Sequence, residues 1–115
     1  MHPQIKAITY ALGEENLSHE DLCERFGVDV MEKVRSFSGI ENRKIAGKDV
    51  CASDLAFIAA EKLFGSKKAK KEDIDLIIVA TQSPDYLLPT TACILQDRLN
   101  LKKSCASFDI NLGCS

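Results

Sequence analysis

The chain has 115 residues, of which 45% are hydrophobic, and these proportions suit one small globular domain. Its formal net charge of −2 and its pI near 5.7 exclude a global basic field that would hold nucleic acid or an anionic membrane. The longest apolar run, residues 55–60, is too short to span a bilayer, and residues 1–12 lack the apolar block of a signal peptide. We therefore expect a cytoplasmic protein.

The cysteine content favours a reducing compartment. The five cysteines are an odd number, form no C-x-x-C pair and have no histidine at ligand spacing, which argues against both a disulfide framework and a zinc site. We expect neither a metal nor another cofactor. Because free cysteine is usually interior, four thiols are predicted to be small buried hydrophobic groups: Cys23, Cys51, Cys93 and Cys105. Cys114 is set apart by the motif around it.

The first quarter of the chain predicts a strand and a helix. Residues 4–12 roughly alternate in polarity, which is typical of an opening strand before a turn at Gly13. Ser18, followed three residues later by an acid, is a helix-start signal, and Gly27 is a helix-stop signal. A helix over 19–26 is therefore predicted.

A second helix and a turn are predicted next. Asp29 with Glu32 repeats the capping pattern, which predicts a short helix through about Arg35. Residues 38–43 have the composition of a turn that leads into a short extended segment.

The middle of the chain predicts a longer helix followed by a basic loop. Ser53 or Asp54 is predicted to cap this helix, and Gly65 to end it. Its core face is predicted to carry four apolar residues, namely Leu55, Ile58, Ala59 and Leu63. The four lysines within 67–71 are interpreted as a solvated loop, with a docking patch for an acidic partner as the alternative.

The last third predicts two strands around one helix. Residues 74–80 are almost continuously apolar, as in a strand that helices cover on both faces of a parallel sheet. Pro89 is predicted to stand in the first turn of a helix whose aligned residues are Ala92, Leu95 and Leu99. The final strand is predicted over 105–110. This alternation of strands and helices is the pattern of an α/β layered domain.

The end of the chain carries the strongest chemical signal. Residues 107–114, SFDINLGC, are typical of a buried strand that runs into a tight turn with a thiol at its tip. A helix that began directly after Cys114 would favour the thiolate through the positive end of its dipole. The pattern indicates a nucleophile elbow, and it suggests that the chain is truncated there.

Four segments together resemble the first part of a β-ketoacyl-acyl carrier protein synthase III, a family of the thiolase-like superfamily. They are SGIENR at 38–43, SDLAFIAAEKLF at 53–64, residues 73–99 and ASFDINLGCS at 106–115. The resemblance implies an α/β thiolase-like layered fold. Residues 1–115 would form its incomplete amino-terminal half, with a mostly parallel sheet between helices.

The resemblance also implies the chemistry. Cys114 would take an acyl primer from a thioester, and the acyl-enzyme would condense with malonyl carrier protein by decarboxylation, as in fatty acid biosynthesis. The backbone N–H of Cys114 would help to form the oxyanion hole. The implied partners are an acyl carrier protein, an acyl-coenzyme A or acyl carrier protein primer, and a second copy in a homodimer.

The other catalytic groups of that family, a histidine and an asparagine, lie downstream of the cysteine and are not in this chain. His2 and His19 belong to no motif and are predicted to lie on the surface. Asn111 is interpreted as a turn residue. The chain alone is therefore expected to be inactive.

Substrate-binding positions are implied at Phe37, Ser38 and Leu88. Lys33 and Phe37 stand where many members of the family have a tryptophan and an arginine that hold the adenine of coenzyme A, which favours a carrier protein donor. Leu88 stands where the family often has a phenylalanine that closes the partner's acyl pocket, which suggests a longer or more branched primer than acetyl. Simple packing in the core is the alternative for both Phe37 and Leu88.

Two other functions remain open at this point. The chain could be a non-catalytic module that binds a partner subunit or a carrier protein. It could also be part of a related condensing enzyme, of the hydroxymethylglutaryl-coenzyme A synthase or chalcone-type polyketide kind. Because the parallel sheet of this superfamily is completed by residues that should follow Ser115, uncovered strand edges and apolar surface predict that the isolated chain self-associates or needs a partner.

Overall fold

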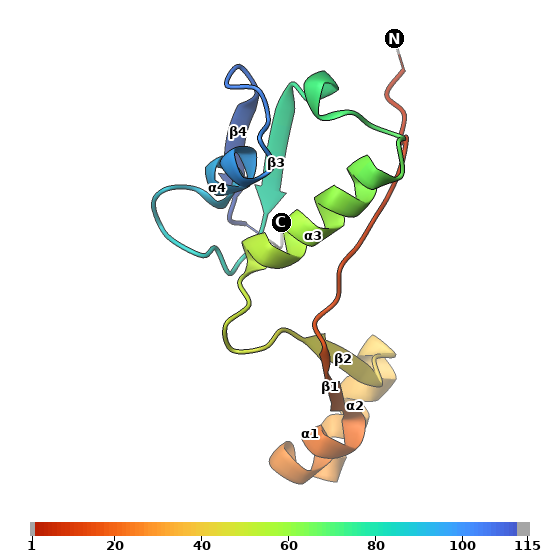
Figure 1. Cartoon of the computed structure of the whole chain (residues 1–115). Coiled ribbons are helices and arrows are strands. Elements are labelled where there is room, and N and C mark those ends of the chain that lie inside the picture. The colour runs from red at the N-terminus through yellow and green to blue at the C-terminus, as the bar shows by residue number, and fades with distance from the viewer. Residues whose placement is uncertain (1, 113–115) are drawn as a thin grey trace. The chain divides into compact units, whose positions relative to one another are not determined.

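The computed structural model describes residues 2–112 and gathers them into two compact units (Figure 1). Unit 2 is Leu12–Asp49, and unit 1 consists of the described residues on either side of it. In chain order the elements are β1 (Glu15–Ser18), α1 (His19–Phe26), α2 (Val28–Ser38), β2 (Asn42–Ile45), α3 (Ala52–Gly65), the 3-10 turn η1 (Lys71–Asp73), β3 (Leu76–Ala80), α4 (Thr91–Arg98) and β4 (Ala106–Ile110).

Unit 2 contains the antiparallel pair of β1 and β2 together with α1 and α2. The predicted helix over 19–26 is confirmed as α1. Its first turn is closed by a capping box, in which Ser18 Oγ accepts from the Asp21 backbone N–H and the Asp21 carboxylate accepts from the Ser18 backbone N–H. Gly27 ends the helix at φ 90°, a conformation that glycine adopts without steric cost.

The predicted boundaries of α2 are wrong at both ends. The helix begins at Val28, one residue before Asp29, and its cap position is Gly27, which has no side chain to accept a hydrogen bond. It continues three residues beyond Arg35, to Ser38. Gly39 then takes the left-handed conformation at φ 67° and donates its N–H to the Arg35 carbonyl. The left-handed glycine is the stronger stop signal.

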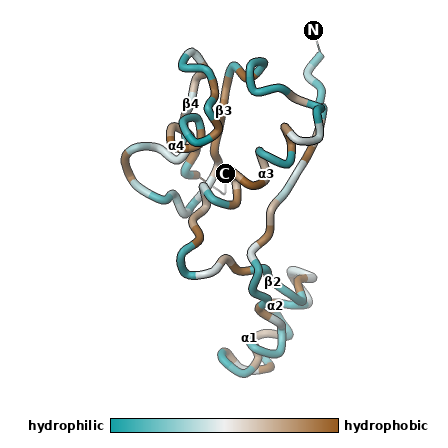
Figure 2. The backbone as a smooth tube through the Cα atoms, viewed as in Figure 1, coloured by the Kyte–Doolittle hydropathy of each residue, from teal (hydrophilic) through white to brown (hydrophobic). Residues whose placement is uncertain are grey.

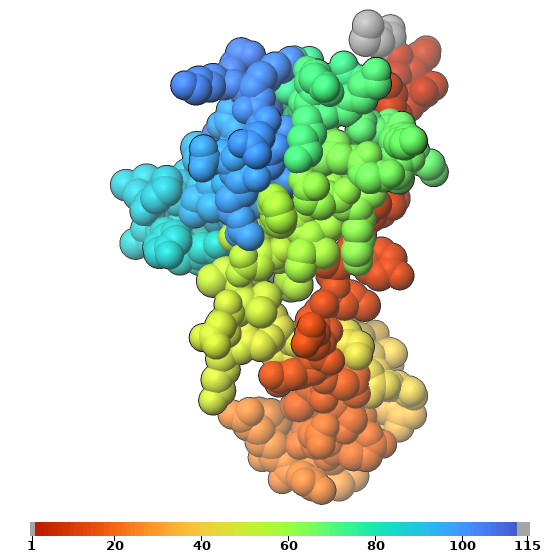
Figure 3. All heavy atoms as spheres, in the orientation of Figure 1, coloured from red at the N-terminus to blue at the C-terminus, as the bar shows by residue number. Residues whose placement is uncertain are grey.

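The predicted opening strand at 4–12 is wrong. The residues of this segment that belong to unit 1 form no strand. They lie alongside α3 (Figure 3). Thr9 Oγ1 donates to the Ala59 carbonyl at 2.8 Å, and Lys62 Nζ donates to the Tyr10 carbonyl at 3.2 Å. An alternating segment becomes a strand only when a neighbouring backbone pairs with it, and the described sheets pair it with none.

Helix α3 has its cap and its core face at different residues from those predicted. Cys51 is the cap residue, and Asp54 accepts the Cys51 backbone N–H at 2.8 Å. The side that packs on the core carries Ala56, Phe57, Ala60 and Phe64, whereas the predicted face was Leu55, Ile58, Ala59 and Leu63. Both sides of this helix are apolar, so periodicity alone does not determine which side is covered.

The core of unit 1 lies between a parallel sheet and its helices. Strands β3 and β4 pair from Leu76 opposite Ala106 to Ala80 opposite Ile110. The core cluster joins α4 to the loop before β4 through Leu95, Leu99, Leu101 and Cys105. The three residues that were predicted to align on this helix are buried, namely Ala92, Leu95 and Leu99. Pro89, however, precedes the cap residue Thr90 and does not stand in the first turn of the helix.

The two faces of the β3–β4 sheet differ in burial. Ile77 and Val79 of β3 pack against the core, and Figure 2 shows β3 as a hydrophobic stretch. The alternate residues point away from it and are 43–48% exposed, namely Leu76, Ile78, Phe108 and Ile110. The expectation that helices cover both faces of this strand is therefore not met in the described chain.

Two predictions about polar and thiol groups are wrong. Of the four cysteines predicted to be buried, Cys105 is buried, Cys23 is half-buried, and Cys51 and Cys93 are exposed. His19, predicted to lie on the surface, is buried, with 6% of its surface exposed, whereas His2 is exposed as predicted.

None of the described helices is both long and apolar enough to cross a bilayer.

The predicted basic loop follows α3. Lys67, Lys68 and Lys70 are exposed, as expected of a solvated loop. Lys71 differs because its Nζ forms an ion pair with Glu61 Oε1 at 2.6 Å.

Candidate active site

Strand β4 leads to the predicted nucleophile and is anchored to α4 by Asp109. The two carboxylate oxygens of Asp109 accept the backbone N–H groups of Thr91 and Ala92, each at 2.7 Å. These amides open α4, where Thr90 makes no side-chain capping bond. A strand residue thus caps the helix that packs beside it, and this fixes the direction in which β4 leaves the sheet.

The predicted nucleophile lies outside the described residues. The structure follows the chain through Asn111 and Leu112, and both side chains are exposed. Cys114, its backbone N–H and the elbow around it therefore stay predictions.

Leu88 lies in the loop that follows β3, and this loop begins at the carboxyl ends of the two parallel strands. Thr81 follows β3 and donates its N–H to the Ile110 carbonyl, so the loop after β3 and the segment after β4 leave the sheet together. Ligands of parallel α/β sheets bind at the carboxyl ends of the strands. Leu88 is 82% exposed and its neighbour Leu87 is 92% exposed, so neither packs in the core of the described chain.

Phe37 and Ser38 belong to unit 2, at the end of α2. Phe37 is 95% exposed, which excludes simple core packing within the described residues. Ser38 Oγ accepts the Ile40 backbone N–H at 3.3 Å across the Gly39 turn. Both side chains stand on a glycine turn that leads into β2.

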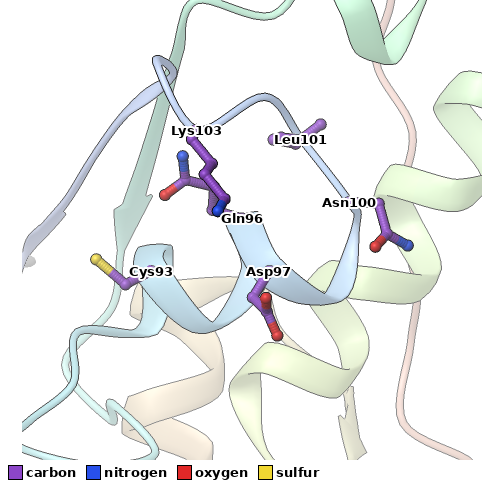
Figure 4. Close-up of a pocket in the computed structure, with 6 residues that line it drawn as sticks. All are labelled: Cys93, Gln96, Asp97, Asn100, Leu101 and Lys103. Atoms are coloured by element: carbon purple, nitrogen blue, oxygen red, sulfur yellow. The ribbon is translucent and has the colours of Figure 1, made fainter.

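A hollow of about 360 Å³ lies along α4 and the following loop, and Figure 4 shows the six side chains that line it. Cys93, Gln96 and Asp97 come from the helix, and the other three come from the loop: Asn100, Leu101 and Lys103. The Gln96 amide donates to the Lys102 and Cys105 carbonyls and accepts from Ser107 Oγ. Because these bonds occupy its central polar group, we assign no catalytic role to this hollow.

The electrostatic surroundings of Cys23 do not favour an activated nucleophile. Burial raises the pKa of the Cys23 thiol, and the negative charge of Glu32 raises it further. A raised pKa keeps a thiol protonated, which makes it a poor nucleophile. Within residues 2–112, no group of three or more His, Cys, Asp or Glu side chains is arranged to hold a metal ion.

Sequence reasoning missed Asp109 as a residue of this site. The available signal was an ionisable residue placed between Phe108 and Ile110 in an otherwise apolar strand. A half-buried carboxylate requires hydrogen-bond donors, and the unpaired amides at the start of a neighbouring helix supply them.

Comparison with known proteins identifies close structural relatives, although no protein-family profile matches the chain. A 3-oxoacyl-(acyl-carrier protein) synthase from Burkholderia xenovorans LB400 is 34% identical, with a TM-score of 0.86, over 97% of this chain and 32% of its own. A 3-oxoacyl-(acyl-carrier-protein) synthase III is 40% identical, with a TM-score of 0.83, over 96% of this chain and 33% of its own.

A third relative is OleA of Xanthomonas campestris in its cerulenin-bound structure. It is 28% identical, with a TM-score of 0.76, over 92% of this chain and 33% of its own. The chain thus spans about a third of the length of the solved structures that it matches. These similarities confirm the predicted fold class: the chain has the mixed α/β architecture of the thiolase-like fold and resembles β-ketoacyl-acyl carrier protein synthase III.

Proposed function

We propose that this chain is the amino-terminal part of a thiolase-like condensing enzyme that acts as an acyltransferase, with Cys114 as its nucleophile. The observation that carries the proposal is the 40% identity to a 3-oxoacyl-(acyl-carrier-protein) synthase III over 96% of this chain. The OleA similarity at 28% identity supports the same superfamily. The hydrogen bonds of Asp109 add support, because they hold β4, the strand that precedes Cys114, against α4. In parallel α/β sheets, ligands bind at the carboxyl ends of such strands.

The proposed reaction has two steps. The Cys114 thiolate attacks the carbonyl carbon of an acyl thioester, the new S–C bond forms, and the donor thiol leaves with a proton. A malonyl thioester on the carrier protein then loses carbon dioxide, and its carbanion attacks the acyl-enzyme carbonyl. The C–C bond forms, Cys114 leaves as a thiolate, and the product is a β-ketoacyl carrier protein.

The donor and the primer are proposed from exposed side chains in the two units. Phe37 and Ser38 would contact the thioester donor, and a carrier protein is favoured over coenzyme A because Lys33 and Phe37 replace the family's tryptophan and arginine. Leu88 would line the acyl pocket of a partner subunit in a homodimer and admit a primer longer or more branched than acetyl. A cytoplasmic location is proposed with this function.

The test is a condensation assay on the full-length protein that carries this chain. Malonyl carrier protein is supplied with acetyl, longer straight-chain and branched acyl groups, each on coenzyme A and on carrier protein, and the β-ketoacyl products are measured by mass spectrometry. The proposal predicts a product with a primer longer or more branched than acetyl and a preference for the carrier protein donor.

Three outcomes would contradict parts of the proposal. A strict preference for acetyl would contradict the role of Leu88, and an equal rate with coenzyme A would contradict the donor assignment. A full-length protein that forms no product with any primer would favour the non-catalytic module. The 115-residue chain by itself is expected to form none.

A further inference from the structure

His19 is a buried ionisable side chain that the proposed chemistry does not use. It opens α1, and 6% of its surface is exposed. Its Nε2 lies 3.0 Å from Glu32 Oε1 of α2. Because an ionised carboxylate only accepts hydrogen bonds, Nε2 is the donor of this pair. Nδ1 is buried and has no hydrogen-bond partner among the described residues, so Glu32 is the one polar contact of the ring there.

Glu32 also contacts a charged side chain further along α2. Its Oε1 also lies 3.6 Å from Arg35 Nη1, one helical turn further on. Arg35 in turn donates from Nη2 to Glu41 Oε1 at 2.6 Å. The hydrogen bond to Glu41 is the main reason that the pKa of the Arg35 guanidinium is raised. A series of four side chains, in which donors and acceptors alternate, therefore connects α1, α2 and the segment before β2: His19, Glu32, Arg35 and Glu41.

The Arg35–Glu41 pair closes over a glycine turn. Gly39 lies between the two residues in the left-handed conformation and donates its N–H to the Arg35 carbonyl. Ile40 donates its N–H to Ser38 Oγ inside the same turn. A glycine turn has many accessible conformations, so a pair that spans it restricts which of them the turn adopts.

We propose that His19 is a positioning residue that, through Glu32 and Arg35, holds the turn formed by Phe37–Glu41. The buried ring fixes the Glu32 carboxylate, the carboxylate orients the guanidinium, and the guanidinium holds Glu41 across the turn. The consequence for donor binding rests on the proposed function, because that function assigns Phe37 and Ser38 to the donor. The positioning of the turn does not depend on it.

The test is amide hydrogen exchange by NMR on this chain, read at Gly39 and Ile40. His19→Leu removes the donor to Glu32, whereas His19→Gln keeps an amide donor at that position. We expect exchange at the two amides to become roughly tenfold faster in His19→Leu, the lower end of the loss for a hydrogen bond to a charged group, and to return toward the original rate in His19→Gln. His2→Leu is the control, because His2 is exposed.

A second variant removes the link without touching the buried ring. Glu32 is about half exposed in the interior of α2, so Glu32→Ala leaves no core cavity and keeps a good helix former. We expect the same loss of protection, with Glu24→Ala as the control, because Glu24 is an exposed acid of α1. If Glu32→Ala leaves exchange at Gly39 and Ile40 unchanged, the proposal is overturned, whether or not His19→Leu folds.

The functional consequence is measured separately in the full-length protein. His19→Leu is expected to raise KM for the acyl donor by about the same factor as the change in exchange, with kcat unchanged, and His19→Gln is expected to restore it. If amide exchange responds and the donor KM does not, the positioning of the turn stands and the donor role of Phe37 and Ser38 fails.

Discussion

Replacing Asp109 by alanine tests whether β4 and α4 are joined as the structure indicates. The substitution removes the acceptor of two backbone N–H groups, those of Thr91 and Ala92, and both of these residues are fully buried. Each buried donor left without a partner costs about 1–3 kcal/mol, and the loss of a helix cap alone costs about 1 kcal/mol. We therefore expect Asp109→Ala to destabilise the chain by about 3 kcal/mol.

The assay is urea denaturation followed by circular dichroism. For an m-value of about 1.5 kcal/mol/M, within the range for small proteins, the loss corresponds to a midpoint lower by about 2 M. Asp109→Asn keeps one acceptor oxygen and is expected to lose about half as much. Asp97→Ala is the control, because Asp97 is exposed on the same helix and surface changes usually stay within about 0.5 kcal/mol. A loss below about 1 kcal/mol in Asp109→Ala would show that the two amides do not depend on this carboxylate.

Further expectations concern stability and association. Thr91→Val should stabilise the chain by about 1 kcal/mol in urea, because the Thr91 hydroxyl is buried without a partner among the described residues; destabilisation would contradict this. Hydrogen bonding from the Cys51 backbone N–H lowers the pKa of Asp54, so Asp54 contributes stability above its unfolded pKa and loses it as pH falls through the lower folded value. Acid titration of Asp54→Asn should accordingly show a shallower loss of stability below about pH 4. Lys67→Gly should stabilise by about 0.5–1 kcal/mol, because Lys67 has φ 60°, whereas Lys68→Gly should not. Sedimentation of the isolated chain should show self-association that Phe108→Ser weakens, because Phe108 lies on the exposed face of the sheet; a monomer at high concentration would refute this.

The elements whose ends carry strong local signals could be predicted from the sequence. Helix α1 was predicted correctly because Ser18 and Asp21 form a capping box within four residues and Gly27 stops the helix. Strands β3 and β4 were predicted to within two residues of their starts, and for β3 the short apolar run rich in β-branched residues favoured a strand. The resemblance supplied the superfamily, which local patterns alone do not give.

The errors arose where distant residues decide the structure. The segment at 4–12 has the alternation of a strand but no backbone beside it to pair with in the described sheets. Helix α3 is apolar on two sides, and only packing against α4 and the sheet reveals which one is covered. The burial of His19 depends on α2, which the sequence around the histidine does not reveal. Each error follows from tertiary contacts that a local pattern does not contain.

The chemistry of the candidate site could be predicted from the sequence. The residues that hold its elements together were harder to predict. The terminal motif indicated Cys114, which lies outside the described residues, and the resemblance implied Phe37, Ser38 and Leu88, which the structure finds exposed. Asp109 was missed because its role depends on two amides that lie 17 and 18 residues earlier in the chain. A cap supplied by another element leaves no signal at the helix that it serves.

Mapping where an acyl group attaches to the full-length protein tests directly whether Cys114 is the nucleophile. The protein is incubated with an acyl thioester, and in parallel with cerulenin, the compound bound in the OleA structure, and digested peptides are analysed by mass spectrometry. If Cys114 is the nucleophile, one adduct forms, on the peptide that contains Cys114, and it is lost in Cys114→Ser but not in Cys93→Ser, which removes an exposed thiol. Adducts spread over Cys51, Cys93 and Cys114 would contradict this assignment.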